Sequence, residues 1–308
     1  MAVYIVKRLT WLPFLLLAVS FITFVLGFYG PGDPAQVRLG ARATPESVAR
    51  VRDQMGLNRP FFIQYGDYVQ KAVRGDLGDS YARDGHTVIE IIGRKVGVSA
   101  QLGLAAIALS LSLGLPLGLI AAYKQGTWID TALVSLALFF YATPVFITAP
   151  FLILTFSLQL GILPTSGWGG LLSPQIIMPA LVLGLPGVAG VTRLTRASAI
   201  EVLSQDYIRT AKAKGLSNIL IQRRHVLPNA LIPIITVLGL SLATLVEGAF
   251  ITETLFGIPG IGRTAVESIF LRDYPVIMGL VLIVAVAFVL TNLLVDILYT
   301  LLDPRIRY

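Results

Sequence analysis

Six long apolar segments constrain this chain more than any other feature of its sequence. A helix needs about 20 apolar residues to cross about 30 Å of hydrocarbon, because each residue adds about 1.5 Å. The segments of sufficient length are residues 5–28, 98–122, 132–160, 176–194, 230–251 and 276–302. Only 13% of the residues are charged, against about 25% in soluble domains. The sequence therefore predicts an all-α polytopic membrane protein with six transmembrane helices in the lipid bilayer.

Basic residues gather at alternate junctions of these segments, and positively charged loops stay on the cytoplasmic side of a membrane. With a cytoplasmic N-terminus, that side receives Lys7, Arg8, Lys124, Arg193, Arg196, Arg209, Lys212, Lys214, Arg223, Arg224, Arg305 and Arg307. The loop at residues 163–175, on the opposite side, has no charge. This pattern predicts that both termini are cytoplasmic. It also accounts for the net charge of +7 without a nucleic-acid partner.

Two connections are too long to be simple turns. Residues 29–97 are polar, mixed in charge and punctuated by Gly and Pro, which predicts an extracytoplasmic region. Residues 195–229 are basic and form a cytoplasmic loop. The expected divisions are an N-terminal transmembrane helix (1–28), the extracytoplasmic region (29–97), a transmembrane domain (98–302) that contains the loop 195–229, and a cytoplasmic tail (303–308).

The cytoplasmic loop has the periodicity of an amphipathic helix. One face would carry Ile200, Leu203, Tyr207 and Ala211, and the other Glu201, Gln205, Arg209 and Lys212. Gly215 suits the end of this helix, a second short helix is expected over residues 217–225, and Pro228 should turn the chain into the fifth segment. Such an element either transmits force from a soluble partner or lies on anionic lipid, and periodicity and charge leave both interpretations open.

The segment Asp206 to Leu231 resembles the cytoplasmic loop of bacterial ATP-binding-cassette (ABC) importer permeases. The pattern of that family is E-A-A, three residues, Gly, nine residues and I-x-L-P. The matching positions here are Arg209, Thr210, Ala211, Gly215, His225, Val226, Leu227 and Pro228. Arg209 replaces the acidic residue and His225 the aliphatic one. The first departure is common in the peptide-importing branch.

Further blocks extend this resemblance over nearly the whole chain. They are GPGDPA (30–35), LNRPFFIQY (57–65), GDLGDS (75–80), ETLFGIPGIGRTAVESIFLRDYP (253–275) and LLDPRIR (301–307). In this order they are similar to the first permease of dipeptide and oligopeptide importers, the inner-membrane components of binding-protein-dependent transport. Each block alone would be a weak signal, but the set is specific.

The resemblance implies a type I ABC importer fold with a MetI-like core and an extracytoplasmic insertion after the first helix. It implies half of a peptide pathway that works by alternating access in a bacterial inner membrane. The implied partners are a second homologous permease in a heterodimer, two cytoplasmic ABC ATPases and an extracytoplasmic substrate-binding protein. No catalysis and no cofactor are expected in this chain, because the ATPases bind ATP and Mg and hydrolyse the nucleotide.

The family's loop is a coupling helix that docks into a cleft of the ATPase. The residues expected to make this contact are Asp206, Tyr207, Arg209, Thr210, Ala211, Lys212, Gly215, Leu227 and Pro228. In this interpretation Ala211 and Gly215 allow close approach, and Leu227 and Pro228 set the following turn.

The sequence GIPGIGRT (257–264) nearly fits the phosphate-binding P-loop pattern. Arg263 stands where a P-loop has its lysine, and Pro259 has no N–H to donate. Charge also places this loop outside the cell, where ATP is absent. We therefore expect a turn that packs against the outer face rather than a nucleotide site.

Two acids, Glu247 and Asp296, fall within the fifth and sixth segments. Acids at membrane depth are costly, which makes a pathway or gating role a hypothesis. Each lies near a segment end, so a structural role is an equal alternative. Glycines recur in the second and fourth segments and predict close helix packing there, with bending of the fourth as the alternative: Gly114, Gly118, Gly184, Gly187 and Gly190.

Other transport and enzyme classes lack their signatures here. A secondary transporter would need an acidic cluster or inverted repeats, and an intramembrane enzyme would need a nucleophile with a base or metal ligands. The chain has no cysteine and two histidines, neither of them in an apolar segment, so no metal site is expected. Peptides are the leading substrate, and nickel chelates, glutathione and oligosaccharides stay open.

Overall fold

The computed structural model describes residues 2–40, 43–231, 233–234 and 250–302. The regular secondary structure of these residues is helical, apart from one isolated bridge between Asp79 and Thr87. Within those ranges, four helices are long and apolar enough to cross a membrane. They include residues Thr10–Phe28, Val88–Tyr123, Pro174–Leu203 and Tyr274–Leu293. The expected all-α membrane architecture is confirmed. The predicted fifth span, residues 230–251, falls mostly outside the described residues.

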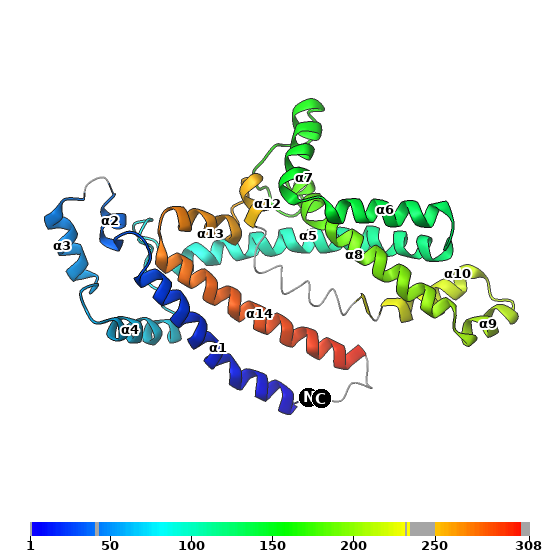
Figure 1. Ribbon diagram of the computed structural model, residues 1–308, viewed down its shortest axis with the longest axis horizontal. Helices are drawn as coiled ribbons and strands as arrows, with labels where there is room; N and C mark the ends of the chain where they lie inside the picture. The colour runs from blue at the N-terminus through cyan, green and yellow to red at the C-terminus, as the bar shows by residue number, and fades with distance from the viewer. Residues whose placement is uncertain (1, 41–42, 232, 235–249, 303–308) are drawn as a thin grey trace.

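Two helix pairs form the frame of the molecule (Figure 1). Helix α1 (Ala2–Phe28) packs along α14 (Tyr274–Leu302), and α5 (Val88–Tyr123) packs along α8 (Ile177–Leu203), which a 3₁₀ turn at Pro174–Ile176 precedes. Helix α6 (Trp128–Ala142) lies against α8 and also contacts α5. Helix α5 begins ten residues before the expected span start at residue 98 because Thr87 caps it, accepting a hydrogen bond from the Glu90 N–H at 3.3 Å.

Small residues let α5 and α8 approach closely, as predicted from the glycines. A Cβ atom built on Gly118 would lie 2.5 Å from Thr195 Cβ and 2.6 Å from the Thr192 carbonyl oxygen. A Cβ atom on Gly114 would likewise lie 2.7 Å from Val191 Cβ, and one on Gly184 would lie 3.0 Å from the Ala106 carbonyl oxygen. Gly190 does not, because its Cβ would meet nothing within 4 Å. Packing therefore explains these glycines except Gly190.

The third predicted span, residues 132–160, is wrong as a continuous helix. The chain turns by 100° between α6 and the helical stretch Val145–Gln159, which comprises α7 (Val145–Leu152) and a π-helical turn (Ile153–Gln159). Pro144 causes the break, because it lacks an N–H and excludes the preceding residue from helical geometry. Thr143 accordingly has an extended ψ of 118°.

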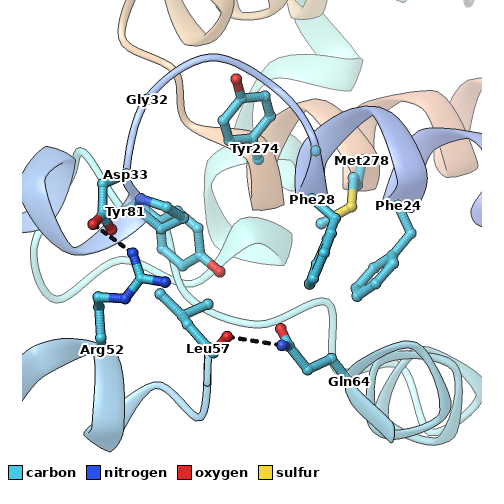
Figure 2. A pocket seen from close by; sticks show the side chains of 12 residues that line it. Phe24, Phe28, Gly32, Asp33, Arg52, Leu57, Gln64, Tyr81, Tyr274 and Met278 are labelled. Atoms are coloured by element: carbon cyan, nitrogen blue, oxygen red, sulfur yellow. Dashed lines mark hydrogen bonds and ion pairs between the residues drawn. The ribbon is translucent and has the colours of Figure 1, made fainter. Parts of the chain in front are cut away.

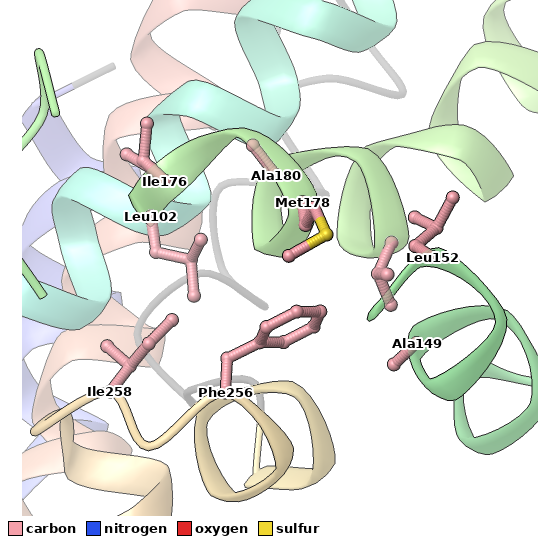
Figure 3. Close-up of a cluster of buried hydrophobic side chains, with 9 residues drawn as sticks. Leu102, Ala149, Leu152, Ile176, Met178, Ala180, Phe256 and Ile258 are labelled. Carbon is pink, nitrogen blue, oxygen red and sulfur yellow. The ribbon is translucent and has the colours of Figure 1, made fainter. Parts of the chain in front are cut away.

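Short helices fill the connections. Between α1 and α5 lie α2 (Pro34–Leu39), α3 (Pro45–Gln54) and α4 (Phe61–Val73). Before α14 lie α12 (Phe250–Leu255) and α13 (Ile261–Phe270). Figure 3 shows how the α12–α13 connection is anchored: Phe256 and Ile258 point into a cluster with Leu102 of α5 and Met178 of α8. This cluster fixes α12 and α13 against the frame.

Candidate functional site

The loop predicted to be cytoplasmic, residues 195–229, contains two short helices, α9 (Asp206–Ala213) and α10 (Asn218–Ile221), followed by a π-helical turn (Gln222–Val226). The loop rests on a buried apolar anchor. Ile208 is 0% exposed and Ala211 is 6% exposed. They pack in one cluster with residues from the ends of α5 and α8, from α10, and from the π-helical turn and the helical residues after it: Leu119, Ala122, Ala199, Ile221, Val226 and Ala230. Close-packed interiors transmit displacement, so movement of α9 carries the ends of α5 and α8 with it.

The other face of α9 is exposed and polar. The side chains of Asp206, Arg209, Thr210 and Lys212 all face outward. Arg209 pairs with Asp206 at 3.4 Å between the guanidinium and a carboxylate oxygen. Both side chains are highly exposed, and such pairs contribute little to stability. This face is therefore available to a partner.

Tyr207 does not lie on the buried face where the periodicity placed it. Its side chain is 44% exposed, and its ring centre lies 6.4 Å from that of His225. The neighbouring Ile208 takes the inward position instead. Tyr207 and Ile219 are thus two exposed apolar side chains of a loop whose surface is otherwise mostly polar.

The continuous helix predicted through residues 200–211 is also wrong, because α8 ends at Leu203 and α9 begins at Asp206. Ser204 donates its hydroxyl to the Glu201 carbonyl at 2.7 Å, and Gln205 adopts an extended ψ of 148°. Serine side chains that bond the local backbone compete with helix continuation. The break allows α9 to point away from α8.

The residues expected to shape the ends of the loop behave differently from one another. Gly215 follows α9 with a φ of +77°, the left-handed conformation that suits glycine. Pro228 does not turn the chain, because residues 227–231 stay helical. The π-helical turn at Gln222–Val226 ends two residues before Pro228 and accommodates a ring that would clash within a regular helix.

An ion pair between Asp130 and Arg196 joins α6 to α8. The Arg196 guanidinium donates to both carboxylate oxygens of Asp130, at 2.6 and 2.7 Å. Asp130 also accepts from the Gly126 N–H at 3.1 Å and is 5% exposed. This bidentate pair fixes α6 to α8, which is one of the two long helices that carry the anchor of α9.

At the opposite end of the molecule, the segment GIPGIGRT (257–264), which nearly fits the P-loop pattern, surrounds the carboxylate of Glu253. Glu253 is 0% exposed, and its carboxylate accepts from the Arg263 N–H at 2.9 Å and from Ser99 Oγ at 2.6 Å. Ser99 in turn accepts from the Ile261 N–H at 2.9 Å. A Cβ on Gly260 would overlap the carboxylate. The glycines therefore make room for Glu253 at the start of α13, where a helix favours negative charge.

A second buried acid links residues 79–87 to the start of α14. Asp273 is 0% exposed and accepts hydrogen bonds from Ser80 Oγ and, at 2.9 Å, from the Tyr81 N–H. Burial, together with the nearby Asp273 charge, raises the pKa of Tyr81 to about 12, although Arg38 opposes this rise. Sequence reasoning missed Glu253 and Asp273, because hydropathy alone does not reveal which loop acids become buried.

A cavity of about 490 Å³ lies between α1, α14 and the short helices that follow α1. Figure 2 shows Phe24 and Phe28 on one side and the ion pair of Asp33 with Arg52, 2.7 Å long, on another. Within the described ranges, no group of three or more Asp, Glu or His side chains could hold a metal ion. Of the two intramembrane acids, Glu247 lies outside the described residues. Asp296 lies in α14, but its side chain is outside the description.

Comparison with known proteins assigns the family. Residues 114–308 match the model of the binding-protein-dependent transport system inner membrane component, and residues 1–100 match the N-terminal model of the same systems. The chain therefore belongs to the family of inner-membrane components of binding-protein-dependent transport systems. Members of this family are membrane permease components of transporters.

Relatives of full length carry peptide-transporter names. The chain is 38% identical over 314 residues to a probable peptide ABC transporter permease of Sinorhizobium fredii, covering 100% of both chains. It is 37% identical over 334 residues to the dipeptide transport permease DppB of Alkalihalophilus pseudofirmus, again with 100% coverage of both. It is 38% identical to the glutathione transport permease GsiC of Shigella flexneri, covering 99% of both.

The fold also matches solved structures. Two inward-facing structures of the MetNI methionine ABC transporter superimpose with TM-scores of 0.55 and 0.58 at 17% identity, covering 70% of this chain and 97% of theirs. The expected type I importer fold is confirmed.

Proposed function

We propose that this chain forms half of the peptide pathway of an ATP-driven importer and works by alternating access. The observation that carries the proposal is the two-sided build of α9. Its exposed face offers Tyr207 among polar side chains, and its buried face, Ile208 and Ala211, packs on the ends of α5 and α8. A partner that grips the exposed face would thus move two long helices.

The proposed partners follow from the two faces of α9 and from the absence of catalysis in this chain. Two cytoplasmic ABC ATPases bind ATP and Mg, hydrolyse the nucleotide and press on α9. A second homologous permease completes the pathway, and an extracytoplasmic binding protein delivers the substrate. This arrangement requires both termini in the cytoplasm, which the basic residues at the expected inner junctions support. The chain itself performs no covalent chemistry. The coupling residues are those expected from the sequence, with Leu227 and Pro228 continuing a helix rather than forming a turn.

Peptides are the substrate that the relatives favour. Their names specify peptides, dipeptides and glutathione, and glutathione is itself a short peptide. Nickel chelates and oligosaccharides are the alternative cargo. Glu247 and Asp296 stay predictions for the pathway or its gate.

Crosslinking tests the ATPase contact directly, because the chain has no cysteine and one introduced thiol is unique. We expect Lys212→Cys, treated with a short thiol-to-amine crosslinker in the purified complex, to capture an ATPase subunit with a yield that changes on ATP addition. Glu46→Cys in α3 is the matched exposed control and should capture none. Failure of capture from positions 206, 209 and 212 alike would refute the contact.

A further inference from the structure

Helix α4 carries an apolar stripe that the described part of the chain leaves exposed at Phe62, Gly66 and Val73 and covers in part at Val69. Phe62, Gly66, Val69 and Val73 follow one another at helical spacing along one side. The side chain of Phe62 is 76% exposed and that of Val73 is 83% exposed. An exposed stripe of this kind marks contact with a partner or with a membrane.

The neighbouring face of α4 packs on α1 through aromatic rings. Phe61, Tyr65 and Tyr68 surround Phe24, with ring centres 5.4 to 5.6 Å away. The Tyr65 hydroxyl lies 2.9 Å from Ser20 Oγ and donates to the Leu17 carbonyl at 3.1 Å. Helix α4 is therefore fixed to α1 by both apolar and polar contacts.

The depth of this contact along α1 identifies the surroundings of α4. Leu17 precedes Phe28, the end of α1, by eleven residues, or about 16 Å of helix. Half the hydrocarbon thickness of a bilayer is about 15 Å. The α1 side chains beside this contact are themselves apolar and exposed, with Ile22 at 58% and Leu26 at 65%. If α1 crosses the membrane, α4 cannot lie wholly above it.

The polar side of α4 is compatible with this depth because two of its polar side chains, Gln64 and Asp67, have partners within the chain. Asp67 pairs with Arg59 at 2.7 Å, and the Gln64 side chain donates to the Leu57 and Arg59 carbonyls at 3.0 and 2.7 Å. Gln64, Asp67 and Lys71 border a cavity of about 610 Å³ rather than the apolar stripe. This is the division expected of a helix that lies in a membrane interface.

We propose that α4 is inserted into the leaflet that meets the Phe28 end of α1, with the stripe of Phe62, Gly66, Val69 and Val73 against lipid acyl chains. Lipid is the favoured occupant because the stripe continues the apolar, exposed surface of α1. The inference does not depend on the transported substrate or on the ATPases. Residues 29–97 then form a region partly embedded in the membrane.

Spin labelling tests this insertion in the full complex reconstituted into phospholipid nanodiscs. Nitroxides are placed at Phe62→Cys and Val73→Cys, and collision rates with molecular oxygen and with nickel-EDDA are measured. Lys71→Cys is the matched control on the polar side of α4. Ile22→Cys in α1 and Glu46→Cys in α3 give the lipid and water references.

The ratio of oxygen to nickel collisions at positions 62 and 73 should equal that at 22 and exceed that at 46 and 71 several-fold. A ratio equal to that at position 46 would place α4 in water and overturn the proposal. Low collision with both probes would also overturn it, because a protein partner would then cover the stripe. Both positions are exposed, so each variant reports independently of the other.

Discussion

Glu253 shows how one carboxylate can replace an external anion at a helix start. Its oxygens accept hydrogen bonds from the Arg263 N–H and the Ser99 hydroxyl, and Ser99 accepts one from the Ile261 N–H at the first position of α13. The resemblance of residues 257–264 to a phosphate-binding loop therefore has a structural cause. Both arrangements place a negative group at a glycine-rich helix N-terminus.

Removing this carboxylate should destabilise the protein. We expect Glu253→Ala to lower the free energy of unfolding by about 1–3 kcal/mol for each buried donor left without a partner. The measurement is unfolding in mixed micelles titrated with SDS. Glu267→Ala is the control, since Glu267 is 39% exposed and its pairs with Arg263 and Arg83 contribute about 0–1 kcal/mol. Equal losses in the two variants would contradict this account of Glu253.

The raised pKa of Tyr81 predicts that the free energy of unfolding decreases in alkaline solution. Burial and Asp273 raise its pKa from 10.0 to about 12 in the folded protein. Its contribution is full below pH 10, and it falls as pH rises towards 12 because the unfolded chain loses its proton first. Unfolding between pH 9 and 12 should show a loss of about 3 kcal/mol that Tyr81→Phe lacks. Identical pH profiles of the two proteins would exclude this linkage.

Among the helices, the α5–α8 contact offers a matched pair of glycines. Gly118→Ala should destabilise by about 1–3 kcal/mol, because the new methyl group meets Thr195 Cβ and the Thr192 backbone. Gly190→Ala adds a methyl group where nothing lies within 4 Å and should be neutral or stabilising by up to about 1 kcal/mol. SDS unfolding distinguishes them. If both behave alike, close packing is not the reason for Gly118.

Two substitutions in α9 should affect different properties: one the coupling of ATP hydrolysis to transport, and the other the stability of the fold. Tyr207→Ala removes an exposed ring, so we expect the free energy of unfolding to change by less than about 0.5 kcal/mol. ATP hydrolysis stimulated by the binding protein should fall about tenfold or more, the effect of losing an interface tyrosine. Ile208→Ala, at a site with 0% exposure, should cost about 2–5 kcal/mol in stability. A destabilised Tyr207→Ala with intact coupling would reverse this assignment.

Helices α1 and α14 could be predicted from apolar length, and the end of α9 from Gly215. Side-chain periodicity could not settle which of Tyr207 and Ile208 is buried, because adjacent apolar residues fit two helical phases. The 100° bend between α6 and α7 was hidden because Pro144 lies within a long, mostly apolar run without a charge. The prediction for Pro228 was wrong in the opposite sense: this proline was expected to end the helix, but the π-helical turn before it lets the helix continue.

At the scale of the whole molecule, the end that carries α9 and the end that carries α13 are built differently. The α9 end has an exposed polar surface on an apolar anchor, and the α13 end has buried acids that fix its loops. The long helices α5 and α8 join the α9 anchor to the cluster around Phe256. This continuity is what a lever needs, because movement at one end must reach the other. The two clusters could not be predicted from the sequence, because each one joins residues that lie far apart along the chain.

The most direct test of the central claim is to identify what the chain binds. The chain would be tagged, expressed with its chromosomal neighbours, purified in mild detergent and examined by mass spectrometry. The account predicts that ABC ATPase subunits and a second, related permease co-purify with it in a fixed ratio. A chain that purifies alone at every detergent strength would contradict the claim that α9 is the lever of an ATP-driven importer.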